Sequence, residues 1–433
     1  MSMSPIDGAA GAAREKHSPR TYTIVGIASL IGTTIEWYDF FVYGTAAALV
    51  FNKIFFPAFD PITGTLAAFG TYAVGFFARP IGAVVFGHFG DKVGRKSMLL
   101  LTLIMMGAPT VLIGLVPTYE KIGYWAAVIL VLMRVVQGLA IGGEYGGAVL
   151  MAVEHAPKGK KGFFGSLPQA GVAFGLVLSS LAMAAVSKLP QQDMLAWGWR
   201  IPFWASIALL TVGWFIRLKI SESPDFVKAQ KQGEQVSAPV LYVLRNHKRE
   251  LLTVAGARLA EVTWFYTVAT FSLSYATQHL HISSSLILNA MIWGSAAALV
   301  TIPIAGLLAD RFQHRAMFGL GAVGICVFGF MFFDLLAAST TSMYVAMLVA
   351  LAGVYALLYG PEGNLFSTQF PASVRYSGIS LAVQTSGAIG GGLAPMIATY
   401  LVKLGNGSPL YLSWYLCLLG LVAILSVSLM KKD

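Results

Sequence analysis

The chain has 433 residues, of which 57% are hydrophobic and only 11% are charged. Charged residues make up roughly a quarter of ordinary soluble domains, so this composition excludes a soluble globular protein and indicates an integral membrane protein. A net charge of +10 would also fit a nucleic-acid-binding protein. The placement of the basic residues decides between the two.

Basic residues gather on one side of the predicted membrane. Most of the 29 Lys and Arg residues lie at the two termini and in one set of alternate loops. The loops on the other side hold Lys53, Lys121, Lys188, Arg200 and Lys403. Because cytoplasmic loops carry the excess of Lys and Arg, we expect both termini in the cytoplasm, most simply at a bacterial inner membrane. Membrane lipid is then an expected partner, and nucleic acid is not.

Apolar runs long enough to cross a bilayer core of about 30 Å recur along the chain. The first half holds runs near 22–51, 62–88, 97–116, 124–152, 162–187 and 200–220. The second half holds runs near 251–277, 286–309, 316–337, 343–368, 377–401 and 410–429. The pattern predicts an all-α membrane protein with twelve transmembrane helices in two six-helix bundles.

The polar stretches divide the chain. We predict a cytoplasmic tail at 1–20, an N-terminal bundle at 21–220, a cytoplasmic linker at 221–250 and a C-terminal bundle at 251–430. The first apolar run is too long for a cleavable signal peptide, so we expect it to remain as the first helix.

A short charged loop, GHFGDKVGRK at 87–96, separates the second and third apolar runs. Gly87 lacks a side chain, so a helix end can lie close to a neighbour, and Asp91 can accept hydrogen bonds from backbone N–H groups at a facing helix N-terminus. Gly94 supplies a tight turn, and Arg95 stays in water. We interpret this loop as a gate whose contacts break when the two halves separate.

A second copy of the loop, GLLADRFQHR, lies at 306–315. The first copy begins at 87 and the second at 306, so the offset is 306 − 87 = 219 residues. It keeps Asp310 and Arg311, but Gln313 replaces the glycine of the turn and His314 replaces an arginine. The offset is about half of the chain, which is typical of two related halves in parallel. The replacements leave open whether this second loop gates as the first does.

Charged groups inside a membrane are costly and are rarely kept without a role. The segment TIEWYDFF places Glu36 and Asp39 three residues apart, on one helical face near mid-membrane. A partly desolvated carboxyl group can exchange protons near neutral pH, so we predict that Asp39 is a proton-exchanging group, with Glu36 as a second candidate. The alternative for every such charge is an ion pair that only holds helices together.

Several segments together resemble a known family. The loop at 87–96 resembles the GxxxDxxGRK signature of the major facilitator superfamily, and EWYDF, FFARPIG, RVVQGLAIGGEYGGA, WGWRIPF and ESPDF resemble its metabolite:proton symporter family. RLAE, SLSYATQ, TIP and LADRF are more similar to the shikimate transporter branch than to the osmolyte branch. The resemblance covers nearly the whole chain. It implies the major facilitator fold and proton-driven uptake of a small, usually anionic, metabolite by alternating access.

Arg134 lies in RVVQG, which matches the RxxQG pattern of this superfamily. We expect its charge to modulate the carboxyl group of Asp39. The acids Glu36, Asp39 and Glu144 are available to balance Arg79 and Arg134 in the N-terminal half, so we expect these two arginines to be neutralised there.

Arg258 is the predicted ligand of a substrate carboxylate. A guanidinium group holds a carboxylate with two hydrogen bonds, and the seventh helix lines the central cavity in the fold that this chain resembles. Glu261, three residues on, is expected to fix the guanidinium group; the alternative is that Arg258 only pairs with Glu261. The other predicted substrate contacts are Arg79, Tyr38, Gln137, Trp264, Tyr266 and Gln384. The aromatic members would line a ring-sized cavity, or would only pack.

Two other functions stay open. One is an osmolyte (betaine or proline) symporter of the same family, and the other is a membrane enzyme or a non-transporting sensor. An enzyme would need a catalytic constellation, and the sequence shows none. Cys326 and Cys417 have no metal-ligand spacing, and there is no GxxxxGK[ST] loop for ATP. We therefore expect a monomeric transporter of protons and a small molecule, with no cofactor and no metal.

Overall fold

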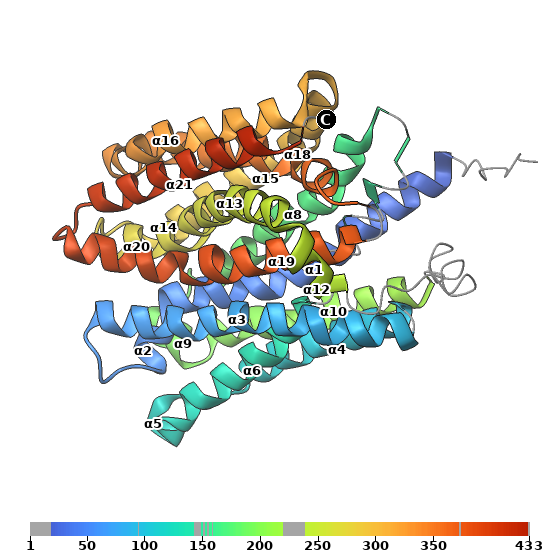
Figure 1. Ribbon diagram of the computed structural model, residues 1–433. Coiled ribbons are helices and arrows are strands. Elements are labelled where there is room, and N and C mark those ends of the chain that lie inside the picture. Colours follow the sequence, from blue (N-terminus) through green and yellow to red (C-terminus); the bar gives the residue numbers. More distant parts are fainter. Residues whose placement is uncertain are drawn as a thin grey trace, which may run out of the picture.

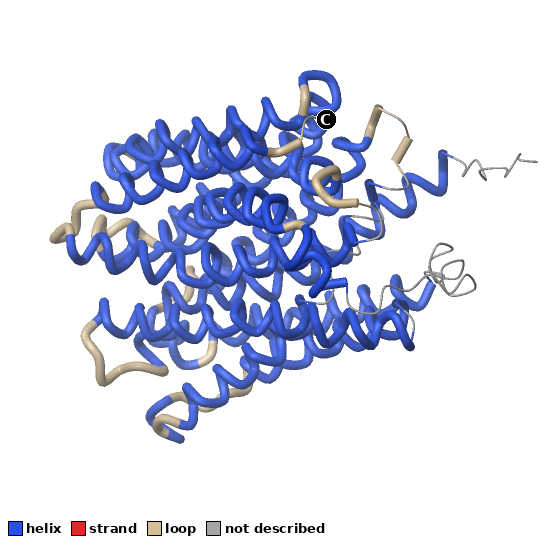
Figure 2. The backbone as a smooth tube through the Cα atoms, viewed as in Figure 1, coloured by secondary structure: helices blue, strands red, loops and turns tan. Residues whose placement is uncertain are grey.

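The computed structural model describes residues 19–93, 95–142, 149, 152–153, 156–157, 159–219, 239–371 and 374–431. Within these ranges every regular element is a helix, and the long helices lie side by side (Figures 1 and 2). Both chain ends that are described lie at one end of the bundle, which we call the linker end; α2 and α5 lie at the opposite, distal end (Figure 1).

Six membrane-crossing segments form the N-terminal half. They are α1 (Pro19–Ala46) with η1 (Ala47–Phe51) and α2 (Asn52–Ile54), α3 (Pro61–Val93), α4 (Arg95–Ile113), α6 (Trp125–Gly142), α8 (Lys161–Val186) and α10 (Ile201–Lys219). Short distal helices connect them: α5 (Tyr119–Ile122), α9 (Gln191–Ala196) and η2 (Gly198–Arg200). The short helix α12 (Pro239–Asn246) lies in the predicted linker, at the linker end (Figure 1).

Six further segments form the C-terminal half. They are α13 (Lys248–Tyr266) with η3 (Thr267–Phe271) and α14 (Ser272–Gln278), α15 (Ser284–Phe312), α16 (His314–Ala338), α17 (Thr340–Leu348) with η4 (Val349–Tyr355) and α18 (Ala356–Ser367), α19 (Arg375–Ser386) with η6 (Gly387–Gly391) and α20 (Gly392–Leu404), and α21 (Leu410–Leu429). The predicted twelve-helix organisation is confirmed.

Eight of these segments meet a strict requirement of length and hydropathy for spanning a membrane. The other four begin at α1, α4, α10 and α13. The apolar part of α4 is short, Leu100–Ile113, and α13 is interrupted by Arg258 and Glu261. Most helix bounds lie within a few residues of the predicted apolar runs, because the bilayer sets the length of each segment. Of the predicted fourth run, residues 143–148, 150 and 151 lie outside the described part of the structure.

Four crossing segments contain π-helical turns, at η1, η3, η4 and η6. In a π turn each N–H group bonds to the carbonyl five residues back, so the helix holds one extra residue and is wider. The turns η1 and η3 begin at 47 and 267, which are 220 residues apart. This distance is nearly the offset between the two charged loops, so the repeat of the two halves extends into local helix geometry.

Asp310, in the second charged loop, joins the two halves at the linker end. Its carboxylate accepts hydrogen bonds from the backbone N–H groups of Gly162 (2.8 Å) and Phe163 (3.0 Å), in the first turn of α8. The positive end of the helix dipole favours this charge. A Cβ atom on Gly306 would lie 2.6 Å from the carbonyl oxygen of Gly162, so the backbones touch and glycine is needed.

The sequence predicted a contact of this type for Asp91 in the first charged loop. The structure shows it for Asp310 in the second charged loop, for which the sequence left a gating role open. For Gly87, Asp91 and Arg95 the structure describes only the helical backbone, and Gly94 lies outside the described residues. Arg311 is exposed at the end of α15. Gating by any of these residues stays a prediction.

Asp310→Asn is expected to favour the state that is open at the linker end. The variant keeps the shape of the side chain but loses the charge on a helix N-terminus, worth about 1–2 kcal/mol, or roughly fivefold to thirtyfold in population. The rate at which an impermeant maleimide labels a Ser166→Cys variant at the linker end, with Cys326 and Cys417 replaced by serine, measures this opening. Asp193→Asn, at the distal end, is the control. An unchanged labelling rate would contradict the assignment.

The halves also meet at mid-depth and at the distal end. Phe41 packs on Phe265 with ring centroids 5.6 Å apart, and the side-chain amide of Gln278 donates to the hydroxyl of Thr65 at 2.9 Å. Aromatic side chains that are at most 2% exposed fill the centre between them. These contacts at both ends and in the middle describe an occluded state.

Candidate functional site

Two buried arginines of the N-terminal half, Arg79 on α3 and Arg134 on α6, lie against one aromatic cluster. The guanidinium carbon of Arg79 is 4.0 Å from the ring centroid of Phe76 and 4.5 Å from that of Phe40. That of Arg134 is 3.6 Å from the ring of Tyr43 and 4.6 Å from that of Phe40. A desolvated cation–π contact is worth about 2 kcal/mol, so the rings stabilise both charges.

Neither guanidinium group forms an ion pair within the part of the chain that the structure describes. The ion pairs there involve other basic residues: His247, Arg258, His314 and Lys431. Arg79 and Arg134 are 5% and 0% exposed, and the Nε and Nη2 atoms of both lack hydrogen-bond acceptors among the described residues. The expected neutralisation by Glu36 and Asp39 is therefore not seen at ion-pair distance, and Glu144 lies outside the described residues. Glu36 and Asp39 act on Arg79 and Arg134 only from beyond ion-pair distance. Buried cations without a close carboxylate are costly, and an incoming anion would relieve that cost.

Asp39 lies inside the N-terminal bundle, between α1, α4 and α10. The hydroxyl of Ser206 donates to its Oδ1 at 2.5 Å, and the hydroxyl of Thr110 interacts electrostatically with the same carboxyl group. The residue is 3% exposed. A void of about 10 Å³ lies beside Asp39 and Glu36, which is close to the space that a single water molecule needs.

A chain of polar contacts leads from Arg134 toward Asp39. Nη1 of Arg134 donates to Oε1 of Gln137 at 2.8 Å, and Nε2 of Gln137 donates to the hydroxyl of Thr110 at 2.7 Å. Gln137 also donates to the carbonyl of Met106 at 3.2 Å. The structure thus gives Gln137, a predicted substrate contact, a place between the cation and the carboxyl group.

Arg258 is held by two carboxylates in the C-terminal half. Its Nη1 atom donates to both oxygens of Glu362 at 2.8 Å and lies 2.7 Å from Oε2 of Glu261. Pairing with Glu261 was the alternative weighed from the sequence. Glu362 was missed, although an acid within an apolar run, directly after Pro361, was a usable signal. Its position 104 residues from Arg258 gave no hint of the pairing.

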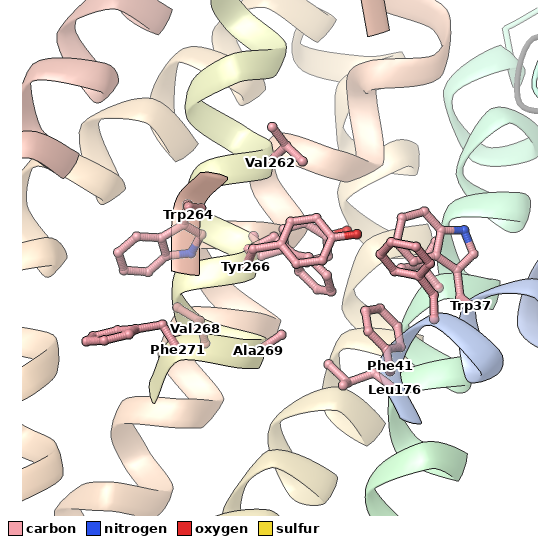
Figure 3. Close-up of a cluster of buried hydrophobic side chains, with 14 of the residues drawn as sticks. Trp37, Phe41, Leu176, Val262, Trp264, Tyr266, Val268, Ala269 and Phe271 are labelled. Atoms are coloured by element: carbon pink, nitrogen blue, oxygen red, sulfur yellow. The ribbon is translucent and has the colours of Figure 1, made fainter. Parts of the chain in front are cut away.

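The predicted aromatic contacts separate into two groups. Trp264 and Tyr266 point in opposite directions from α13, Tyr266 toward Trp37 and Phe41 and Trp264 away from them (Figure 3). The indole N–H of Trp264 donates to the carbonyl of Ala350 at 3.2 Å, inside the C-terminal half.

Tyr38 is turned into its own half, where its hydroxyl donates to the carbonyl of Pro202 at 2.8 Å. Tyr266 instead packs on Phe76 across the two halves, with ring centroids 5.2 Å apart, and interacts electrostatically with Arg79. Gln384 is buried on α19. Of the predicted residues, the structure therefore brings Arg79, Arg134 and Tyr266 together at the centre.

Comparisons with known proteins agree with this architecture. Residues 24–255 match the family model described as sugar (and other) transporter, and residues 254–432 match that of the major facilitator superfamily. The chain belongs to the major facilitator superfamily. It is a multi-pass membrane protein and a secondary transporter, not an enzyme.

Relatives within the superfamily cover nearly the whole chain. The shikimate transporter of Escherichia coli is 40% identical over 413 residues, 94% of each chain. The proline/betaine transporter of the same organism is 33% identical over 418 residues, 94% of this chain and 82% of its own. A crystal structure of a D-xylose-proton symporter matches the fold with a TM-score of 0.73 at 16% identity, covering 95% of this chain and 97% of that one.

Proposed function

We propose that this protein is a proton-coupled symporter that imports a small ring-bearing organic acid, similar to shikimate, by alternating access. One observation carries the proposal: Arg79 and Arg134 are two buried cations at the centre, caged by rings and without carboxylate partners among the described residues. The similarity to a shikimate transporter supports the same substrate class. The protein acts as a monomer in a bacterial inner membrane, with both termini in the cytoplasm.

In this proposal the substrate carboxylate binds to Arg79 and Arg134. Bidentate guanidinium–carboxylate contacts are strong and directional, and the two cations are already desolvated. The substrate ring replaces aromatic side chains that fill the centre in the occluded state. Tyr266 belongs to the C-terminal half, so its hydroxyl reaches the same ligand from the other side. A bound anion then draws the halves together.

Arg258 is the weaker candidate for the anion. It already faces Glu261 and Glu362 at 2.7 and 2.8 Å, and two carboxylates repel a third. The substrate ligand that the sequence predicted in the C-terminal half is therefore assigned here to the N-terminal half.

Proton coupling is assigned to Asp39. An ionised Asp39 stabilises the charge of Arg134 through Thr110 and Gln137, and a protonated Asp39 leaves that charge to the substrate. Proton binding at Asp39 therefore favours anion binding at Arg134, and the two ligands move together. Glu36, next to the same void, is the second candidate for this role.

The alternative substrate is a betaine-like osmolyte, as the proline/betaine relatives suggest. Such a molecule has a carboxylate for the arginines but also a quaternary ammonium group, which two unneutralised cations repel. The arginine pair therefore favours an anion over a zwitterion.

The test is transport by purified protein in proteoliposomes under an imposed pH gradient, alkaline inside, with the membrane voltage clamped at zero. We expect accumulation of labelled shikimate and competition by other small ring carboxylates. The neutral methyl ester of shikimate should compete at least tenfold more weakly, because it loses a charged hydrogen bond. Accumulation of glycine betaine but not of shikimate would select the osmolyte alternative.

A further inference from the structure

The C-terminal half contains a charged cluster that the proposed function does not use. Arg258, Glu261 and Glu362 are 5%, 1% and 0% exposed, and both carboxylates contact the same guanidinium nitrogen. Glu261 comes from α13 and Glu362 from α18. Two ionised carboxylates at such short range repel each other, and buried acid pairs of this kind commonly share a proton.

The two carboxylates do not compete equally for Arg258. Glu362 accepts hydrogen bonds at 2.8 Å on both of its oxygens. Glu261 makes only the 2.7 Å ion contact, and its Oε2 accepts no well-aligned hydrogen bond from the described residues. Glu362 therefore holds the guanidinium group, and Glu261 is the carboxyl group whose charge is less well compensated.

The groups that face Glu261 can support a neutral carboxylic acid. Glu261 interacts electrostatically with Arg258 and Glu362, and also with Tyr355 of η4 and Tyr359 of α18. The hydroxyl of Tyr359 is buried and has no hydrogen-bond partner in the described part of the chain. It is available as an acceptor for an acidic proton.

The cluster also lies next to contacts between the two halves. Gln169 of α8 donates to the carbonyl of Tyr359 at 3.3 Å. A Cβ atom on Gly363, next to Glu362, would lie 3.2 Å from the carbonyl oxygen of Gly165 on α8. Separation of α8 from α18 at the linker end would therefore let water reach the cluster.

We propose that Glu261 is a second proton-binding site, which is occupied in the occluded state and releases its proton when the halves open at the linker end. Only one O–H bond changes: the carboxylic acid of Glu261 gives a proton to water and becomes a carboxylate that pairs with Arg258. With Asp39 as the first site, two protons accompany each substrate molecule.

Infrared spectroscopy tests the occupancy without any substrate, and so independently of the proposed function. A protonated carboxylic acid has a C=O stretching band that a carboxylate lacks. Measured in an Asp39→Asn background, Glu261→Gln should remove one such band. Glu362→Gln should remove it too, because Glu261 then pairs alone with Arg258 and ionises. Glu250→Gln, a change at the surface pair with Lys431, should leave it in place. A band that survives in both cluster variants would overturn the proposal.

Transport tests the release of the proton. At zero membrane voltage, one pH unit of gradient supports about tenfold accumulation for each coupled proton. The parent protein is expected to reach about a hundredfold and Glu261→Gln about tenfold, with exchange of substrate at equal concentrations retained. Glu250→Gln should match the parent. An unchanged accumulation ratio in an exchange-competent Glu261→Gln variant would overturn the second site and leave the anion site at Arg79 and Arg134 standing.

Discussion

Replacing Arg79 by glutamine is expected to weaken binding of the anionic substrate by about a hundredfold or more. The variant loses charged hydrogen bonds worth roughly 1.5–3 kcal/mol each, and about 1.4 kcal/mol corresponds to a tenfold change in Kd. Arg79→Lys keeps the charge but loses the planar fork, so its loss should be nearer tenfold. Isothermal titration of purified protein with shikimate measures both values.

Two further arginines provide the comparison. Arg200 lies at the distal end and donates to the carbonyls of Gly114 and Val116, so Arg200→Gln should leave Kd within about twofold. Arg258→Gln distinguishes the two possible anion sites. If it weakens binding a hundredfold while Arg79→Gln does not, the substrate carboxylate lies on the C-terminal half and the assignment made here is wrong.

Asp39→Asn is expected to lower the accumulation ratio about tenfold for each pH unit of imposed gradient. The asparagine amide does not bind or release a proton near neutral pH. It has the size of the aspartate side chain, and its carbonyl oxygen can still accept a hydrogen bond from Ser206. Substrate binding and exchange at equal concentrations should continue, since the variant resembles the protonated state. Flux measurements in proteoliposomes at zero voltage separate accumulation from exchange.

The double variant with Glu261→Gln should show no accumulation, because both proposed proton sites are then removed. Asp334→Asn, an exposed change on α16, is the matched control and should accumulate substrate as the parent does. An Asp39→Asn protein that retains the full accumulation ratio would refute coupling at Asp39 and would direct attention to Glu36.

The fold was largely predictable from the sequence. A spanning helix needs a long apolar run, so the positions of the apolar runs predicted the number of spanning segments and most of their ends. The repeated charged loop gave the relation between the halves. In the same way, charges inside apolar runs identified Asp39, Arg79, Arg134 and Arg258 as residues of interest.

The partners of these residues were not predictable. Whether Arg134 meets a carboxylate or an aromatic ring depends on how α6 is rotated against α1 and α3, which a single sequence does not encode in any local pattern. Glu362 reaches Arg258 from another helix, and spacing rules describe neighbours on one helix only. The sequence placed Asp310 in the imperfect second copy of the charged loop. Its carboxylate accepts hydrogen bonds from the first turn of α8, 148 residues away, and no local pattern indicates that contact.

The π turns at η1 and η3 have a consequence for how the halves can move. Helices kink most readily where their hydrogen-bond ladder is interrupted, and here the first helix of each half is interrupted at the corresponding place. Both helices can therefore flex at the same depth while their ends stay packed. Loss of the one extra residue would restore a straight axis and would turn everything beyond it by about 100°. In α14 that rotation would carry Gln278 away from Thr65, so the closure of the distal end depends on an irregularity in the backbone as much as on the side chains that meet there.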